Sequence, residues 1–293
     1  MRTTFIENLV KEAKKDKSIV LLVGDLGFNV VETFQENFPK RFYNVGVAEQ
    51  NMMSIAAGLS SQGFKVFTYS IANFPTFRCA EQIRNDIDYH NFNVTIVTVG
   101  GGYAYGNLGY SHHAVQDYGL MRLFPNFDII APADPVEVES ALRYILSTNG
   151  PKYLRLNKNK DNILFKKNIF FKPGDFNYYK KVKNSKKLIL STGSVLNSSL
   201  HLCRKEKYKN FSIATCPIWS KKHKKKIVQN LKNYNNLVIL EDHYLDCGFA
   251  SFLLEIINEF KLKNISLYSI SLKAKFNYKV ASQKKLNSLN DLH

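Results

Sequence analysis

The chain of 293 residues is 45% hydrophobic and 13% aromatic, enough apolar material for folded cores, which excludes a disordered protein. Its apolar runs are far shorter than the ~20 residues that a helix needs to cross a bilayer, and its first residues lack the apolar core of a secretory signal. The four cysteines are scattered and form no C-x-x-C pair. We therefore expect a cytoplasmic protein without a membrane segment.

Positive charge dominates: 41 Lys and Arg residues against 24 Asp and Glu residues give a formal net charge of +17. The excess gathers in the second half of the chain, in clusters such as KKVKNSKK (180–187) and KKHKKK (221–226). These clusters lack interleaved aromatic residues and belong to no recognisable nucleic-acid-binding module. We expect a surface that faces solvent or a protein partner and attracts anionic substrates, and we do not expect a nucleic-acid partner.

Short apolar runs alternate with helical patterns along the first half of the chain. The strand-like stretches are 18–27, 42–47, 64–71, 93–102, 127–134 and 151–156. The helical patterns are 4–15, the segment that begins near Glu49, 75–88 and 135–147. Strands that alternate with helices indicate a parallel sheet covered on both faces.

The alternation of strand-like and helical stretches stops between residues 157 and 185 and then resumes. Strands are predicted at 186–194, 211–216, 236–243 and 265–270, with helices at 195–207, after Ser220 and at 250–260. The sequence therefore predicts an α/β protein of two domains, each a mainly parallel sheet flanked by helices. The first domain would cover 1–170 and the second 187–293, with a linker over 171–186 that contains at most one strand or hairpin.

One acidic residue, Glu49 in NVGVAEQNMM, follows an apparently buried strand and opens an amphipathic helix. An acidic residue in the first turn of a helix interacts favourably with the helix dipole, and this alone would account for a glutamate at position 49.

Phe74 and Phe77 lie three residues apart, a spacing that usually marks core residues. The functional alternative is a flat heteroaromatic ligand stacked against the two rings.

The loop GGGYAYGNLGYSHH (100–113) follows a strand but fits neither G-x-G-x-x-G nor the P-loop pattern. Ligands of open α/β sheets bind at this carboxyl end of the strands. The loop ends in His112 and His113, which have no acidic or cysteine cluster beside them, so we predict no metal site. A histidine could serve there as a proton donor, acceptor or shuttle, and packing within the loop is an equal alternative.

Several motifs occur in one order: DLG (25–27), RFYNVGVAEQNM (41–52), the phenylalanine pair, GYSHHAVQDYGLMR (109–122) and PADPVEVE (132–139). This order resembles the pyrimidine-binding domain of the transketolase family of thiamine diphosphate enzymes. STGS and VILEDHYLDCGFAS, in the second half, are similar to the C-terminal domain of the same family. The resemblance implies a transferase of two-carbon ketol units.

The resemblance also implies roles for individual residues. Glu49 would hydrogen-bond N1′ of the cofactor's aminopyrimidine and share a proton with it. Phe74 and Phe77 would form the aromatic side of the pocket around that ring, and Asp25 would lie near the thiazolium. His112, with His113 beside it, would face the substrate, while Arg155 or Lys158 would meet an anionic group of the substrate.

The chain lacks the second half of a thiamine diphosphate site. That half commonly carries G-D-G followed by Asn-Asn, which binds the diphosphate and Mg²⁺, and GDLG (24–27) does not fit it. We therefore expect a β subunit that works only with an N-terminal-half transketolase subunit carrying G-D-G…N-N, as an α₂β₂ heterotetramer.

The substrates are left open. Leu108 and Ala80 stand at positions where pentose-phosphate transketolases typically carry other residues. The substrate could therefore be a modified or nucleotide-linked sugar instead of an ordinary sugar phosphate. The alternatives are a 1-deoxyxylulose-phosphate synthase-like or 2-oxoacid dehydrogenase β-type subunit, or a non-catalytic scaffold.

Overall fold

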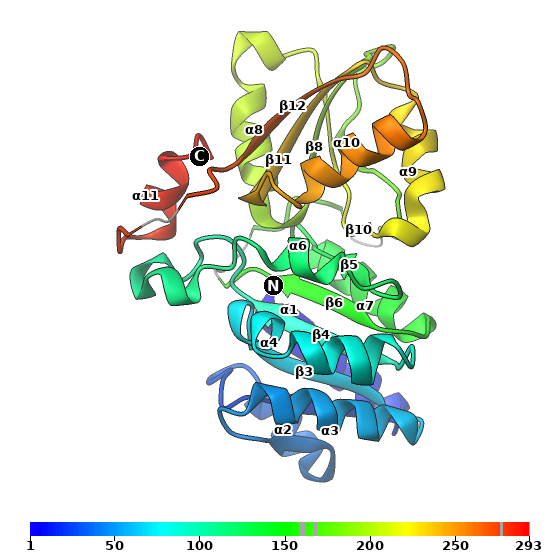
Figure 1. Cartoon of the computed structure of the whole chain (residues 1–293), viewed down its shortest axis with the longest axis vertical. Helices are drawn as coiled ribbons and strands as arrows, with labels where there is room; N and C mark the ends of the chain where they lie inside the picture. The colour runs from blue at the N-terminus through cyan, green and yellow to red at the C-terminus, as the bar shows by residue number, and fades with distance from the viewer. Residues whose placement is uncertain (159–161, 167–168, 276–277, 293) are drawn as a thin grey trace.

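The computed structural model describes residues 1–158, 162–166, 169–275 and 278–292. It contains two mainly parallel sheets, one above the other along the long axis of the molecule, with helices on both faces of each (Figure 1). This confirms the predicted α/β architecture. No helix within the described residues is both long enough and apolar enough to cross a membrane.

The first sheet has seven strands in the order β10-β5-β6-β4-β3-β1-β2. All its strands except β10 run parallel, and β1 and β4 are buried along their whole length, as is typical of the central strands of a sheet covered on both faces. The strands contributed by the first half of the chain are β1 (Ile19–Val23), β2 (Phe42–Asn44), β3 (Lys65–Ile71), β4 (Val94–Val99), β5 (Asp128–Ile130) and β6 (Lys152–Leu156).

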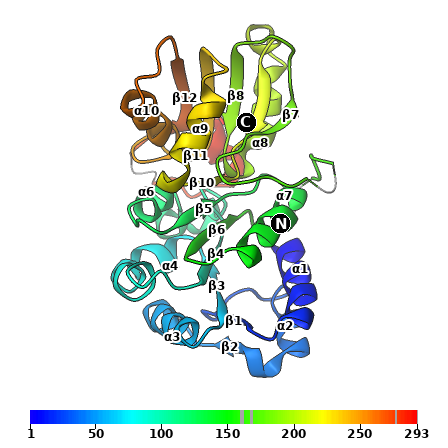
Figure 2. The same ribbon diagram turned by 90° about the vertical axis from the view of Figure 1, so that its right-hand side faces the viewer.

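Helices cover both faces of this sheet (Figure 2). On one face α1 (Arg2–Lys15) packs against α7 (Pro135–Ser147) and α2 (Glu32–Asn37), and on the other lies α3 (Glu49–Ser61). The helix predicted over 75–88 is instead three short elements: α4 (Asn73–Phe77), α5 (Ala80–Gln82) and a π-helical turn (Ile83–Asp88). The break falls at Cys79, whose φ of −114° and ψ of 12° leave the helical region.

The second sheet has the order β12-β11-β8-β9-β7. Its parallel strands are β8 (Lys187–Ser191), β9 (Ser212–Thr215), β11 (Asn236–Tyr244) and β12 (Ser266–Leu272), and its helices are α8 (Leu196–Cys203), α9 (Lys224–Leu231) and α10 (Phe249–Glu259). The segment 171–186, expected to be a linker, contributes the antiparallel edge strand β7 (Asn177–Lys180). The division at 171–186 stays a prediction.

One short strand connects the two halves. β10 (Ile218–Trp219) comes from the second half of the chain but pairs antiparallel with β5, at the edge of the first sheet. Trp219 is fully buried there, and its indole N–H donates to Thr192 Oγ1 at 3.1 Å. The two halves therefore share a sheet edge as well as a packed boundary.

The C-terminal helix α11 (Gln283–Ser288) returns to the first half, beside a short 3₁₀ turn (Gly106–Leu108) in the glycine-rich loop (Figure 1).

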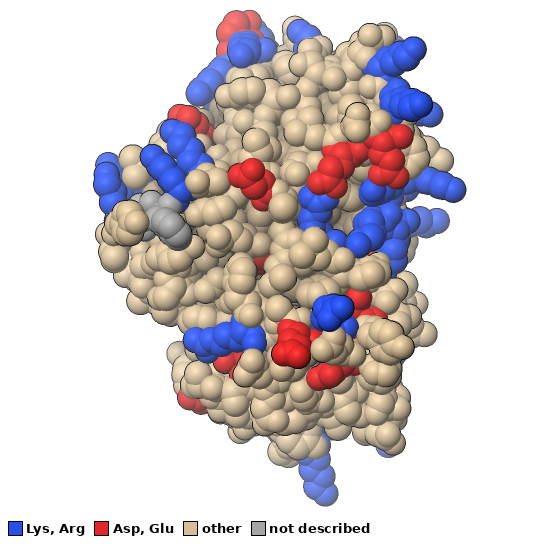
Figure 3. All heavy atoms as spheres, viewed as in Figure 1, with Lys and Arg blue, Asp and Glu red and all other residues tan. Residues whose placement is uncertain are grey.

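Positive charge is distributed unevenly over the molecule. On the face seen in Figure 3, most Lys and Arg side chains lie over the second sheet and its helices. The first half presents fewer of them on this face.

Candidate active site

Glu49 is held at the start of α3, directly after the carboxyl end of β2. Gly46 (φ +73°) allows the chain to turn between the two elements. The Glu49 side chain is only 2% exposed, yet Arg78 Nη1 donates to its Oε2 at 2.9 Å. Ser70, at the end of β3, places its hydroxyl 3.5 Å from Oε1. A buried carboxylate thus lies where the carboxyl ends of the strands meet, the usual ligand side of such a sheet.

Arg78 connects Glu49 to an aromatic side chain. Its guanidinium carbon lies 4.3 Å from the centre of the Phe74 ring, over the ring face. The His112 ring meets Phe74 edge to face, with centroids 5.1 Å apart. The fold therefore brings Glu49, Phe74 and His112 into one cluster. Phe77, the last residue of the helix that carries Phe74, is 46% exposed.

His112 is partly buried, and its Nδ1 lies 3.0 Å from the Ser111 hydroxyl. Burial, and then the positive charge of Arg78, lower the pKa of His112 below its ordinary value. A neutral imidazole has one N–H donor and one acceptor nitrogen, so this side chain can exchange protons with a hydroxyl near neutral pH.

His113 occupies a different environment from its neighbour. It is 2% exposed and packs edge to face on Tyr103, with centroids 4.8 Å apart. Burial lowers the pKa of His113 as well. Tyr103 belongs to an apolar cluster formed mainly by the second half of the chain, so the structure does not bring His113 together with Glu49 and Phe74.

Asp25 lies at the carboxyl end of β1 and is exposed. Its backbone is in the left-handed region (φ +56°), which aspartate tolerates better than most residues. Asn44 Nδ2 donates to its carboxylate at 3.0 Å, and its own N–H donates to Asn44 Oδ1 at 3.1 Å. This reciprocal pair fixes an exposed acid beside the turn that leads to Glu49.

The side chain of Arg155 lies inside the protein. Its side chain is 3% exposed, with Nε 2.8 Å from Asp117 Oδ2 and Nη1 2.5 Å from Asp242 Oδ1. Nη2 donates to the carbonyl of Ala114 at 2.9 Å. The guanidinium is thus engaged by buried partners within the protein, and its contact with an anionic group of the substrate stays a prediction.

Lys158 is placed differently. Its Nζ lies 4.4 Å from the centre of the Tyr105 ring, and that ring is 6.3 Å from the His112 ring. Lys158 also borders a cavity of about 640 Å³, together with Ser194, Asp242 and Lys284. It is therefore close to the histidine loop and faces open space.

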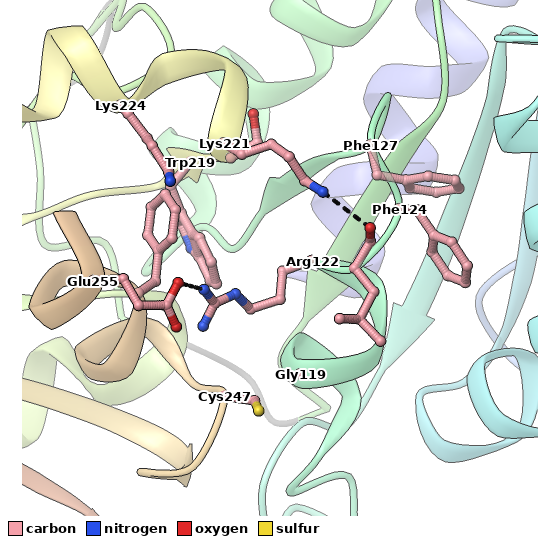
Figure 4. A pocket seen from close by; sticks show the side chains of 12 residues that line it. Gly119, Arg122, Phe124, Phe127, Trp219, Lys221, Lys224, Cys247 and Glu255 are labelled. Carbon is pink, nitrogen blue, oxygen red and sulfur yellow. Dashed lines mark hydrogen bonds and ion pairs between the residues drawn. The ribbon is translucent and has the colours of Figure 1, made fainter. Parts of the chain in front are cut away.

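A second cavity, of about 320 Å³, opens at the boundary between the two halves of the chain (Figure 4). Trp219 and Cys247 help to line it, and its cations are already engaged: Arg122 pairs with Glu255, and Lys221 Nζ donates to the Leu123 carbonyl at 3.0 Å. None of the predicted site residues lines this cavity.

Among the described residues, no group of three or more His, Cys, Asp or Glu side chains is arranged to hold a metal ion.

Two residues of the cluster carried no predicted role. Ser70 sits on an apolar strand, where a serine gives no signal of function. Arg78 was more accessible to sequence reasoning because it follows Phe74 by four residues, a helical spacing that places the two side chains on one face.

Comparisons with known proteins identify the family to which the first half of the chain is similar. Residues 1–162 match the family described as "Transketolase, pyrimidine binding domain". A "Putative transketolase C-terminal section" from Methanocaldococcus jannaschii is 39% identical over 166 residues, which are 56% of this chain and 52% of that protein. The aligned part thus spans about half of that relative.

Two longer matches cover nearly the whole chain. One of the subunits of an "Apulose-4-phosphate transketolase", from Actinobacillus succinogenes, is 28% identical over 257 residues, which are 87% of this chain and 82% of that protein. The solved structure titled "Split gene transketolase, inactive beta4 tetramer" superposes with a TM-score of 0.83 at 28% identity and covers 99% of this chain and 93% of its own. The chain therefore belongs to the family of transketolase pyrimidine-binding domains.

Proposed function

We propose that this chain is the β subunit of a split, thiamine diphosphate-dependent transketolase that transfers a two-carbon ketol unit between sugar substrates. One observation carries the proposal: a buried carboxylate, Glu49, meets a planar N–H donor that lies over the face of Phe74. The family match and the relatives named as transketolase subunits support the same reading.

The residues fit the aminopyrimidine of thiamine diphosphate. The Arg78 guanidinium is a stand-in: it is flat, lies 4.3 Å over Phe74 and donates an N–H to Glu49 at 2.9 Å. An aminopyrimidine in that place would be stacked on the same ring and hydrogen-bonded to the same carboxyl group. Phe77 would complete the aromatic wall. When bound, the cofactor supplies the nucleophilic carbon that takes up the two-carbon unit.

The side chains of this chain would then act on protons and charge. The Glu49 carboxyl group would share its proton with ring atom N1′, in a pocket where burial strengthens the hydrogen bond. His112, kept neutral by its lowered pKa, would exchange a proton with a substrate hydroxyl. Lys158 would attract an anionic group of the substrate, and Asp25 would lie near the thiazolium. We assign no substrate role to His113.

A partner subunit would supply the rest of the site, including Mg²⁺ and the diphosphate contacts, in an α₂β₂ heterotetramer. Phe28, Val47 and Phe77 are 69%, 72% and 46% exposed and lie on segments near the carboxyl ends of the first sheet's strands. Exposed apolar side chains of this kind mark surfaces that a partner covers. The four free cysteines support a cytoplasmic location.

The substrate class is proposed from charge and from the relatives. One relative is named for apulose 4-phosphate, which supports a phosphorylated sugar. The cavity bordered by Lys158 and Lys284 would also suit the longer anionic portion of a nucleotide-linked sugar.

The decisive experiment replaces Glu49 in the complex reconstituted with its partner subunit. Glu49→Gln keeps the size of the side chain but cannot share a carboxyl proton, so we expect kcat to fall by about 10²–10⁴-fold. Glu81→Gln, the same change at an exposed position nearby, should leave turnover unchanged. Unchanged turnover in E49Q would favour a scaffold role, and ketol transfer by this chain alone would contradict the need for a partner.

A further inference from the structure

We propose that Arg78 is an internal ligand of the cofactor pocket, which must leave both Glu49 and Phe74 before the aminopyrimidine can bind. This inference rests on the proposed function. It concerns a step that precedes catalysis: the exchange of one flat group for another on the same two protein contacts.

The contacts of Arg78 coincide with those expected of the cofactor ring. Its Nη1 donates to Glu49 Oε2 at 2.9 Å, and its guanidinium carbon lies 4.3 Å over the Phe74 ring. The face of Phe74 that the guanidinium covers accepts only one flat group at van der Waals distance, and Arg78 Nη1 already occupies Oε2 of the carboxylate beside it. Binding of the ring and retention of the Arg78 contact are therefore mutually exclusive.

Arg78 is positioned to leave. Its side chain is 48% exposed, whereas that of Glu49 is 2% exposed, so the guanidinium reaches the carboxylate from the solvent side. It follows the last residue of the short helix α4 (Asn73–Phe77), and rotation about its side-chain bonds would carry the guanidinium into solvent without moving Phe74. Water would solvate the released guanidinium, so the cost of breaking the pair falls on the buried Glu49 carboxylate and not on Arg78.

Arg155 provides a contrast within the same chain. Both of its ion pairs, with Asp117 and Asp242, join side chains that are at most 3% exposed. Releasing that arginine would leave buried charges without a counterion, which is strongly unfavourable. The Arg78 pair differs because an incoming ring would take over the contact with Glu49, with the carboxyl proton shared between Glu49 and N1′. The carboxylate is thus held in its binding orientation by a group that the cofactor can displace.

The test measures thiamine diphosphate binding directly by titration calorimetry of the reconstituted complex with Mg²⁺, with no substrate present. Arg78→Met keeps the length of the side chain but removes its charge and its donors, so it cannot compete for Glu49. We expect the Kd for thiamine diphosphate to fall by roughly three- to tenfold, the scale of a half-exposed ion pair. Arg84→Met, at an exposed position on the adjacent π-helical turn, is the matched control and should leave Kd unchanged.

A double variant tests the route of the effect. If Arg78 competes through Glu49, the gain in affinity should shrink markedly when R78M is made in the Glu49→Gln background. Arg78→Lys, which keeps the charge but not the flat fork, should give a Kd between wild type and R78M, and thermal unfolding checks that each variant is folded.

The outcomes separate the two hypotheses. Unchanged or weaker cofactor binding in R78M would overturn the internal-ligand proposal while leaving the transketolase assignment intact. Failure of the wild-type complex to bind thiamine diphosphate at all would instead overturn the proposed function.

Discussion

At the level of single residues, Arg155 connects three segments that are distant in sequence. From the end of β6 it pairs with Asp117 of α6 (Asp117–Met121) and with Asp242 of β11, and it donates to the carbonyl of Ala114 next to the histidine loop. Burial opposes the charge of Arg155, but the two aspartates more than compensate and raise its pKa well above the ordinary value. The arginine therefore links the end of the histidine loop to β6 and β11.

Replacing Arg155 should destabilise the fold. In Arg155→Met, Asp117 and Asp242 keep their burial but lose their shared cation, and breaking a buried pair in this way costs about 3–5 kcal/mol. We expect the free energy of unfolding, measured by urea denaturation, to fall by that amount. Arg84→Met, on the surface, should change it by no more than about 0.5 kcal/mol. A stable R155M with a raised KM for an anionic sugar would instead support the predicted contact of Arg155 with the substrate.

The same residues show what sequence can predict about the candidate site. Glu49, Phe74 and His112 could be named in advance because each sits in a local motif, and the fold brings them together. The ion pairs of Arg155 could not be predicted, because its partners lie 38 and 87 residues away and nothing in its neighbourhood reveals which way it faces. The ion pair between Arg78 and Glu49, 29 residues apart, escaped prediction for the same reason.

At the level of elements, the C-terminal helix α11 supports the turn that leads to His112. Leu286 is fully buried, and a Cβ added to Gly106 would come within 2.5 Å of its Cδ1 and 2.6 Å of the Ala281 carbonyl. Position 106 therefore requires glycine so that the two segments can approach closely. The Ala281 N–H donates to the Gly106 carbonyl at 3.3 Å, which adds a direct link.

Truncating Leu286, which packs beside Gly106, should make local opening of the histidine loop more frequent. In Leu286→Ala the loss of buried methyl groups leaves a cavity beside residue 106, a change that costs about 2–5 kcal/mol where the surroundings cannot collapse. We expect faster amide hydrogen exchange over residues 103–113. Leu289→Ala, at a side chain that is 42% exposed, is the control. Exchange in the loop that is identical in L286A and wild type would show that α11 does not support it.

Most regular elements could be predicted from sequence because parallel strands and their covering helices carry long, clear patterns. β1, β3 and β4 of the first sheet lie within the predicted stretches. β10 has only two residues, too few for any periodicity, and α11 has one buried residue, Leu286. Both are defined by what they pack against, so local sequence could not reveal them.

At the level of the whole molecule, Glu137 joins the two halves through a buried polar contact. It lies on α7, beside the first sheet, and accepts hydrogen bonds from Asn177 of β7 (2.7 Å) and Thr215 of β9, both in the second sheet. The Ala133 N–H also donates to it, at 2.7 Å. Burial raises the pKa of Glu137 from 4.5 to about 7, and these hydrogen bonds only partly oppose the rise.

This pKa makes the junction sensitive to pH. Between pH 4.5 and about 7 the unfolded chain has released the Glu137 proton while the folded chain retains it, so folding takes up a proton and stability falls as pH rises. Over that window the contribution amounts to on the order of 3 kcal/mol. In Glu137→Gln the side chain is neutral in both the folded and the unfolded chain, so this variant should not lose stability in this way as pH rises.

The measurement is the difference in unfolding free energy between wild type and E137Q, from urea denaturation at pH 5, 6, 7 and 8. The difference is needed because Lys152 and Glu241, with pKa values of about 7 and about 8, titrate in the same range in both proteins. We expect E137Q to gain stability relative to wild type as pH rises from 5 to 7, with little further change above. Glu139→Gln, a partly exposed acid on the same helix, should track wild type. A constant difference between E137Q and wild type at all four pH values would mean that Glu137 is already ionised at the junction, with its charge balanced by the three donors around it.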